Sequence, residues 1–393
     1  MRGHVRLRGN IWYAVLSVGK GNERKTVWRS LPECKGKREA ETECRRLVRE
    51  IDTGDFVMTD SSTVAQWIEH WLSIGCPGRK RKAVGNKTRE RYGELLRTYI
   101  LPSLGNRPLQ KLQSTEIDAL YTRLREKISE RTLLNAHIVL ASALAMAFRT
   151  RKIGRNPVLD VVKVPSPGEA DHGIVLDKDE LRTLVQGFKE RDSILFPIVA
   201  TLAWTGMRRG ECLALRWSDF DAKAKTLRIE RSVEETEAGL AIKGPKKDSH
   251  KRTIAIGDDL VALLVSEREK HLRIVADVPS GAHVDLSLVR LPEGTLIFPN
   301  LRNGDFTTLR SPIGVSNLFK HIAKLVGFPK VRLHDLRGSH ETALLDAGVP
   351  VHTVAARCGH DPATLLRSYA KRTRKADESA AAVIGSLSAG VLT

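Results

Sequence analysis

The stretch Arg332-Leu333-His334-Asp335-Leu336-Arg337-Gly338-Ser339-His340 is the most informative part of this sequence. His334 and Arg337 are three residues apart, so on a helical turn they share one face. The guanidinium of Arg337 is a fixed fork of donors that suits a phosphate, and His334 accepts or donates a proton near neutral pH. The pair predicts a phosphate site, provided that a nucleophile and further cations come from elsewhere in the chain.

The composition favours a nucleic-acid partner. The chain has 393 residues, of which 41% are hydrophobic, and a net charge of +19. This length allows two or three domains with real cores, and a strongly basic balance favours a polyanion. A basic protein without a specific partner is the alternative on charge alone.

The cysteines and apolar runs indicate the compartment. The five cysteines form no CxxC pair, which argues against a zinc knuckle or a disulfide framework and fits a reducing cytosol. The first ten residues are charged, unlike a signal peptide, and apolar runs such as 195–204 are too short to cross a membrane. We therefore expect a cytoplasmic, nucleoid-associated protein without a membrane partner.

Residues 1–57 predict a small sheet with one helix. Strands are expected at His4–Arg8, Ile11–Val18 and Lys25–Leu31, followed by a helix at Lys37–Ile51. A basic three-stranded sheet backed by a helix can place its strands in a DNA major groove. A scaffold or an oligomerisation unit would show the same pattern.

Residues 58–164 predict a helical domain for binding rather than chemistry. Four helices are expected. The first covers Thr63–Ile74, and the second runs from a cap at Asn86 or Thr88 to about Leu101, where the region of Pro102 and Gly105 stops it. The third begins at Ser114, and the fourth covers Arg131–Lys152. The basic loop 78–82 suits a DNA backbone. The Pro- and Gly-containing segment 165–174 reads as a linker.

Residues 175–393 predict a mainly helical unit with a small sheet. Strands are expected at Thr226–Val233 and Lys251–Ile256, while 278–294 is irregular. After the stretch Thr205–Glu211, a further helix is expected to continue through Leu213, Leu215 and Trp217. The remaining helices are expected at 177–190, 193–204, 260–272, 315–325, 339–347, 351–357, 362–375 and 379–387.

A series of cations and one tyrosine carries the expected chemistry. No Walker loop, HExxH pair or obvious carboxylate trio is present. Instead the chain offers, in order, Arg208, Lys246, His334, Arg337, His360 and Tyr369. This set is suited to phosphoryl transfer through a phosphotyrosine: the arginines neutralise the phosphate, a His or a water takes the phenol proton, and a Lys protonates the leaving alkoxide. No metal or other cofactor is required.

Each position also has a simpler interpretation when taken alone. Arg208 can be a surface residue at a helix start, His360 can cap the following helix, and Tyr369 can be a packing residue. His334, His340 and His360 can also be read as a metal cluster, although Cys, Asp or Glu at ligand spacing is missing.

Taken together, these motifs resemble the tyrosine recombinases of the phage integrase family. Thr205–Glu211 looks like the family's first arginine box, with Arg208 as the arginine and Glu211 as its supporting acid, and Pro245-Lys246 looks like its lysine hairpin. His334 to Arg337 resembles the HxLR motif, Cys358-Gly359-His360 the Gly-His motif, and Tyr369 stands where the nucleophile belongs. Gly338-Ser339 and Cys358 depart from the common His-Thr and Leu, which concerns packing more than chemistry. Lys243, Lys247 and Lys251 lie close enough to compete with Lys246.

The resemblance implies an α+β multidomain fold. Residues 1–57 would form an arm-type DNA-binding domain, 58–164 a helical, SAM-like core-binding domain, 165–174 a linker and 175–393 a mainly α catalytic domain with a small antiparallel sheet. The segment 278–294 looks like an insertion without an assigned role.

The resemblance also implies a site-specific DNA recombinase that integrates or excises a mobile element such as a prophage. Tyr369 would form a 3′-phosphotyrosine, Arg208 and Arg337 would clamp the phosphate, His334 would act as base and acid, His360 would hydrogen-bond a phosphate oxygen, and Lys246 would be the general acid. The first partner would be double-stranded DNA, at core and arm sites. Four subunits would form a homotetramer, in which Ser379–Leu387 of one subunit would pack on a neighbouring subunit. A DNA-bending protein and an excisionase are possible accessory partners. A type IB topoisomerase and a non-catalytic DNA-binding regulator are the alternatives.

Overall fold

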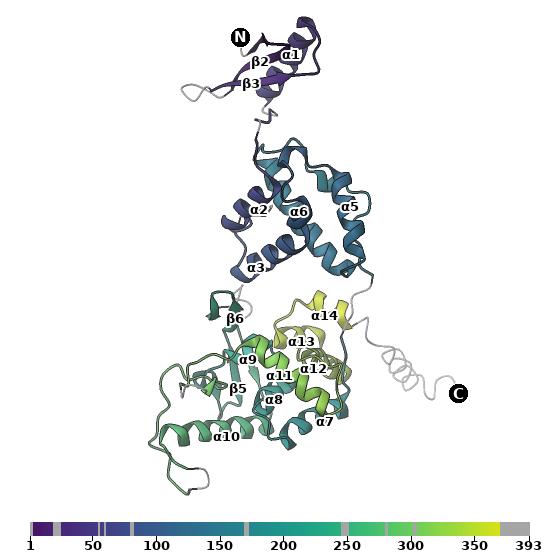
Figure 1. Ribbon diagram of the computed structural model, residues 1–393. Helices are drawn as coiled ribbons and strands as arrows, with labels where there is room; N and C mark the ends of the chain where they lie inside the picture. Colours follow the sequence, from purple (N-terminus) through teal and green to yellow (C-terminus); the bar gives the residue numbers. More distant parts are fainter. Residues whose placement is uncertain are drawn as a thin grey trace, which may run out of the picture. The chain divides into compact units, whose positions relative to one another are not determined.

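The chain forms two compact units, Met1–Ala170 and Asp171–Thr393 (Figure 1). The computed structural model describes residues 3–18, 25–53, 56–58, 60–78, 82–168, 173–244, 251–279, 282–301 and 305–369. For Tyr369 the description covers the backbone alone. Lys246 and Lys247 lie outside the described residues, as do the expected helix at 379–387 and the end of the expected helix at 362–375.

The first unit begins with a three-stranded antiparallel sheet and a helix. The strands β1 (Gly3–Arg8), β2 (Ile11–Val18) and β3 (Lys25–Leu31) lie in the order β1-β2-β3. Alternate residues of β2, such as Ala14 and Leu16, are buried against α1 (Lys37–Thr53), which contributes Ala40, Cys44 and Leu47. Because strand residues alternate between faces, Tyr13 and Trp28 lie on the face of the sheet that is turned away from α1.

The rest of the first unit is helical. Its helices are α2 (Val64–Ser73), α3 (Asn86–Leu95), the π-turn η2 (Leu96–Ile100), α4 (Leu101–Leu104), the 3₁₀ turn η3 (Leu109–Lys111), α5 (Ser114–Arg125), α6 (Glu130–Arg149) and the 3₁₀ turn η4 (Pro157–Asp160). The expected cap at Asn86 or Thr88 is wrong, because Gly85 occupies the cap position. The expected stop in the region of Pro102 and Gly105 is confirmed, since α4 ends at Leu104 with Gly105 as its C-cap. Pro102 itself lies in the first turn of α4, where its missing N–H is not needed.

Helix α6 is the centre of this helical core. By length and hydropathy it is the one helix among the described residues that is able to cross a membrane. Seven of its residues are nevertheless buried against the neighbouring helices: Leu133, Ala136, Val139, Leu140, Ala143, Leu144 and Ala147. Its apolar character is therefore accounted for by packing inside the unit.

The second unit is built from helices around α8 (Phe196–Thr205), which contacts α7, α10 and α12 (Figure 1). The helices are α7 (Lys178–Glu190), α9 (Arg209–Leu213), α10 (Asp258–Val275), α11 (Pro312–Leu325), α12 (Asp335–Asp346), α13 (Val351–Cys358) and α14 (Pro362–Tyr369). All side chains of α8 except that of Trp204 and the half-buried Phe196 are buried, which explains its unbroken apolar sequence.

Two small sheets lie in the second unit. One has the order β4-β5-β8, with β4 (Phe220–Asp221), β5 (Thr226–Ile229) and β8 (Arg252–Ala255). The other is a hairpin of β6 (Ser232–Thr236) and β7 (Gly239–Lys243). The single strand expected at Thr226–Val233 is thus two strands in different sheets, and β7 was not expected. The division follows from the pairing partners, because β5 pairs with β4 and β8 whereas β6 pairs with β7. Local β-propensity does not report which strands pair.

The helix that was expected to continue through Leu213, Leu215 and Trp217 ends at Leu213. Leu215 and Trp217 are buried, but from an extended segment and the 3₁₀ turn η5 (Trp217–Asp219). Arg216 forms an isolated antiparallel bridge with Leu296. The spacing of two between these apolar residues fits an extended chain better than a helix.

Candidate active site

A cleft of about 650 Å³ in the second unit brings three of the predicted site residues together. Arg208, His334 and Arg337 line it, with residues from α11 and the segment 329–333 forming other parts of the wall. His360 lies at the side of this cleft, where it accepts a hydrogen bond from Arg337. Four residues that are up to 152 positions apart in sequence therefore meet at one place.

Arg208 is placed by the turn between α8 and α9. Gly206 ends α8 with φ +65°, and a Cβ there would lie 2.5 Å from Cδ2 of His340. Two residues later, the backbone N–H of Arg208 donates to Glu211 Oε2 at 2.9 Å and its Nη1 donates to Glu211 Oε1 at 2.9 Å. Its Nη2 donates to the carbonyl of Gly359 at 2.6 Å. Glu211 thus orients the arginine as a supporting acid would.

Arg337 lies in the first turn of α12 and is 3% exposed. Its Nη1 donates to the carbonyl of Gly206 at 2.8 Å, and its Nε–H donates to His360 Nε2 at 3.0 Å. Glu341 Oε1 is also 3.0 Å from Nε, but the single N–H is directed at His360, so the contact with Glu341 is ionic. No described residue accepts a hydrogen bond from Nη2 of Arg337. A buried donor of this kind is suited to an anion that enters the cleft.

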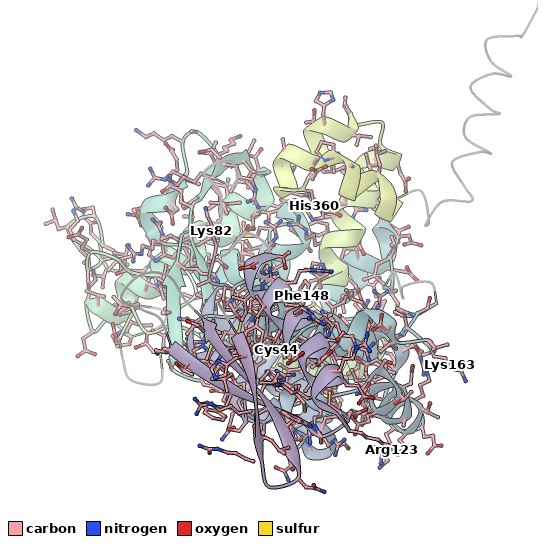
Figure 2. All side chains as sticks on the ribbon, turned by 90° about the horizontal axis from the view of Figure 1, so that it is seen from above. Cys44, Lys82, Arg123, Phe148, Lys163 and His360 are labelled. Atoms are coloured by element: carbon pink, nitrogen blue, oxygen red, sulfur yellow. The ribbon has the colours of Figure 1, made fainter. Side chains whose placement is uncertain are left out.

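His360 follows Gly359, which ends α13 in the left-handed region with φ +67°. Figure 2 labels His360, which lies beside the yellow helices of the second unit. Burial, together with the charges of Arg337 and Arg208, lowers the pKa of His360 to about 3. The ring is therefore neutral at pH 7. Because Nε2 accepts from Arg337, we assign the ring proton to Nδ1. That Nδ1 is buried and has no hydrogen-bond partner among the described residues, so it is a second unused donor.

His334 occupies the position just before α12, one turn from Arg337. Burial lowers the pKa of His334, and the charge of Arg337 lowers it further. A neutral imidazole in this cleft is able to accept a proton at pH 7. The expected helix at 339–347 begins earlier, at Asp335, so that His334 and Arg337 share its first turn.

The lysine and the tyrosine are located less fully. Lys246 lies outside the described residues, and Lys243 forms an ion pair with Glu234, which leaves it poorly suited to donate a proton elsewhere. Tyr369 is the last residue of α14. This helix contacts α13 through the buried Leu365. The element that carries Tyr369 therefore adjoins the element that leads to His360.

His340 is not arranged as a metal ligand. Its Nδ1 is 3.0 Å from the carbonyl of Ala203, and its Nε2 accepts from Arg357 Nε at 3.3 Å. Both ring nitrogens are thus occupied by the protein. Within the described ranges, no group of three or more His, Cys, Asp or Glu side chains is arranged to hold a metal ion.

Arg252 and Glu341, which contact Glu211 and Arg337 respectively, were not identified in the sequence. Glu341 is four residues after Arg337, which is the spacing of an ion pair on one helix face. Arg252 is two residues before the buried Ile254 in a strand, so period-two alternation indicates that it faces the core. Both signals were present in the sequence.

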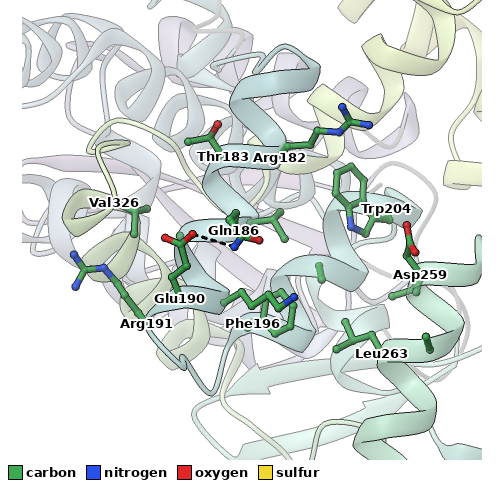
Figure 3. A pocket seen from close by; sticks show the side chains of 16 residues that line it. Arg182, Thr183, Gln186, Glu190, Arg191, Phe196, Trp204, Asp259, Leu263 and Val326 are labelled. Carbon is green, nitrogen blue, oxygen red and sulfur yellow. Dashed lines mark hydrogen bonds between the residues drawn. The ribbon is translucent and has the colours of Figure 1, made fainter.

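A larger cavity of about 1050 Å³ opens between α7, α8 and α10 (Figure 3). Arg182, Gln186, Trp204 and Leu263 are among its walls, and Gln186 Nε2 donates to Glu190. The described residues that line it include none of the predicted site positions. Size alone therefore does not point to a reactive site in this unit.

Comparison with known proteins assigns the family. Residues 175–375 match the model of the phage integrase family, and residues 63–125 match the model of the phage integrase N-terminal SAM-like domain. This chain belongs to the phage integrase family. The resemblance derived from the six motif positions is confirmed, and with it the tyrosine recombinase fold and the assignment as a site-specific recombinase. The role of each residue and the domain bounds stay predictions.

Relatives and solved structures agree with this assignment. An integrase of Saccharopolyspora erythraea is 23% identical and the match covers 91% of this chain and 90% of that protein. A XerC-like tyrosine recombinase of Caldanaerobacter subterraneus is 25% identical over 90% of each chain. The Tn1549 transposon integrase in complex with a circular intermediate DNA has a TM-score of 0.63 at 20% identity, covering 83% of this chain and 100% of that chain. A lambda integrase dimer bound to a COC′ core site has a TM-score of 0.58 at 16% identity, covering 94% and 95%.

Proposed function

We propose that this recombinase cleaves and rejoins duplex DNA through a 3′-phosphotyrosine on Tyr369, and that it integrates or excises a mobile element. The observation that supports the proposal most directly is the gathering of Arg208, His334, Arg337 and His360 at one cleft. Arg337 Nη2 and His360 Nδ1 are buried donors without hydrogen-bond partners among the described residues. A scissile phosphate in the cleft would satisfy both.

The arginines provide the electrostatic part of catalysis. Negative charge grows on the non-bridging oxygens as the phosphorus becomes five-coordinate, and donors already held in place stabilise that charge. Arg208 and Arg337 are held by Glu211, Gly206 and His360, so little reorganisation is needed when the phosphate binds. His360 Nδ1 would donate to one of the same oxygens.

Proton transfer completes the step. The phenol of Tyr369 attacks phosphorus, the bond from phosphorus to the 5′ oxygen breaks, and the strand is left joined to the protein through its 3′ phosphate. His334, neutral because burial lowers its pKa, takes the phenol proton. Lys246 gives a proton to the departing 5′ oxygen. In the reverse direction the 5′-hydroxyl of a partner strand attacks, and the tyrosine recovers its proton.

We propose that three domains bind the DNA, with the bounds 1–57, 58–164 and 175–393, and that residues 165–174 are the linker before the last of them. We also propose that four subunits assemble on two duplexes, in the cytoplasm. The face of the N-terminal sheet that is turned away from α1, where Trp28 is exposed, supports an arm-site contact. Arg8 and Arg6 lie 4.4 and 5.8 Å from the centre of the Trp28 ring, and Tyr13 packs edge-on against that ring. Arginines and exposed aromatic edges on a strand surface are suited to a DNA groove.

A suicide DNA substrate tests the covalent step. The wild-type protein should become covalently joined to a nicked substrate that releases its short 5′-hydroxyl fragment, and mass spectrometry should place the DNA on the peptide of Tyr369. Tyr369→Phe should bind the same DNA and form no adduct, while the control Tyr99→Phe, a residue at the helical core of the first unit, should react as the wild type does.

Other outcomes of the same assay separate the alternatives. If neither the wild type nor Tyr369→Phe forms an adduct, the protein is a DNA-binding regulator and the proposal fails. If supercoiled DNA without attachment sites is relaxed and no strands are exchanged, the activity is that of a type IB topoisomerase.

A further inference from the structure

Arg252 is a buried cation that the mechanism above does not use. It is the first residue of β8 and pairs with Ile229 of β5, on the same face as Ile254. Ile229 and Ile254 are 2% and 4% exposed, and the Arg252 side chain is 8% exposed. An arginine on the core face of a strand requires strong partners.

Those partners are Glu211 and the end of α13. Arg252 Nη2 donates to Glu211 Oε2 at 2.8 Å, and Nη1 donates to Glu211 Oε1 at 3.3 Å. Its Nε donates to the carbonyl of Arg357 at 2.7 Å. Glu211 also binds Arg208, so one carboxylate joins two guanidinium groups. Burial by itself raises the pKa of Glu211, but the hydrogen bond and charge of Arg252, aided by Arg208, lower it below the ordinary value.

The turn before His360 packs against the same two arginines. Gly359 has φ +67°, and a Cβ there would lie 2.9 Å from Nη1 of Arg252 and 3.5 Å from Nη1 of Arg208. The carbonyl of Gly359 accepts from Arg208, and the carbonyl of Arg357 accepts from Arg252. The backbone that leads into His360 is therefore held on both sides.

We infer that Arg252 is a positioning residue that fixes Arg208 and His360 relative to each other; this rests on the proposed function of the cleft. Arg252 is not among the residues that line the cleft, so it acts through Glu211 and the carbonyl of Arg357. Lysine at position 252 keeps the charge but loses the planar fork, and one ammonium cannot hold both oxygens of Glu211 and the carbonyl in the same geometry.

The test compares Arg252→Lys with a matched variant, Arg231→Lys. Arg231 also forms a partly buried pair with a carboxylate, Asp219, and its ion-pair partners Asp219 and Glu230 are not among the residues that line the cleft. Single-turnover cleavage of the suicide substrate is measured with the full chain over a range of DNA concentrations, and each variant's thermal unfolding is recorded. A second substrate carries a neutral methylphosphonate at the scissile position.

For Arg252→Lys, the cleavage rate at saturating DNA should fall roughly 100-fold, the size expected when a catalytic group is misplaced by about an ångström. The DNA concentration at half-saturation should change less than about twofold, because the DNA-binding surfaces are untouched. On the methylphosphonate the deficit should shrink by about tenfold, since less charge is left for Arg208 to neutralise. Arg231→Lys should cleave both substrates at close to the wild-type rate.

Two results would overturn the role of Arg252. One is an Arg252→Lys rate within about threefold of the wild type. The other is an equal deficit on both substrates together with a lowered unfolding temperature, which indicates a general loss of folded protein. A wild-type protein that forms no adduct is a separate result, which overturns the proposed function and this role with it.

Discussion

Two buried carboxylates hold the arginines of this site. Glu211 binds Arg208, and Glu341 lies against Arg337; the two acids are 7% and 4% exposed. Burial lowers the pKa of the Arg337 guanidinium, and the charge of Glu341 opposes that shift. A cationic site can be preformed without phosphate only if such countercharges lie beneath it.

At the residue scale, Glu341→Gln should lower the free energy of unfolding by about 3 kcal/mol, because it leaves the charge of Arg337 buried without its partner. Urea unfolding followed by tryptophan fluorescence measures the change. The control is Glu269→Gln, since Glu269 pairs with Arg273 from a side chain that is 54% exposed. That variant should change stability by less than about 1 kcal/mol. Equal effects of the two substitutions would show that the charge of Glu341 is not needed.

At the element scale, two helix ends aim the reactive groups. Gly206 ends α8 and Gly359 ends α13, both in the left-handed region. The carbonyl of Gly206 accepts from Arg337, and that of Gly359 accepts from Arg208. Each turn therefore presents a backbone acceptor to an arginine from another element, which ties α8, α12 and α13 together at the cleft.

Gly206→Ala tests this arrangement. The new methyl group would meet the ring of His340 at 2.5 Å in addition to the strain of φ +65°, so the stability loss should be about 3 kcal/mol. The control is Gly348→Ala, where φ is +78° but no atom lies within 4 Å of the added Cβ. There the loss should be about 1 kcal/mol, the strain alone. Thermal unfolding and the rate of cleavage of the suicide substrate are measured for both variants. Equal losses of stability in the two variants would argue against a close approach of position 206 to His340.

At the scale of the whole molecule, buried histidines make stability depend on pH. Burial lowers the pKa of His271 and of His340 to about 4, from an ordinary value of 6.5. Below pH 6.5 the unfolded chain binds protons that the folded chain does not. The stabilising contribution is therefore complete above pH 6.5 and is lost as the pH falls toward 4.

The variant His271→Gln should make the pH dependence shallower. Each of these histidines contributes about 3 kcal/mol to the fall in stability between pH 7 and pH 4. Glutamine keeps an acceptor for Trp217 Nε1, which bonds to His271 at 3.0 Å. The variant should be less stable at pH 7 but should lose about 3 kcal/mol less on acidification, as measured by urea unfolding at several pH values. A wild-type slope in the variant would contradict the lowered pKa.

The sequence by itself determined the order and type of the cleft residues and most of the helices. Arg208, His334, Arg337 and His360 lie in short local motifs, and helix positions follow from a periodicity that is also local. The structure places these four residues as one group, as their order in the chain indicated.

Only the tertiary structure decided how the cleft is held. The expected strand is divided because β5 pairs with β8, which lies further along the chain, and β6 pairs with β7, which was not recognised in the sequence. The partnership of Arg252 with Glu211 and with the carbonyl of Arg357 spans 41 and 105 positions. The physical reason is that burial and strand pairing are properties of the packed chain. The type of a residue is encoded locally, while its countercharge comes from whichever element folding brings beside it.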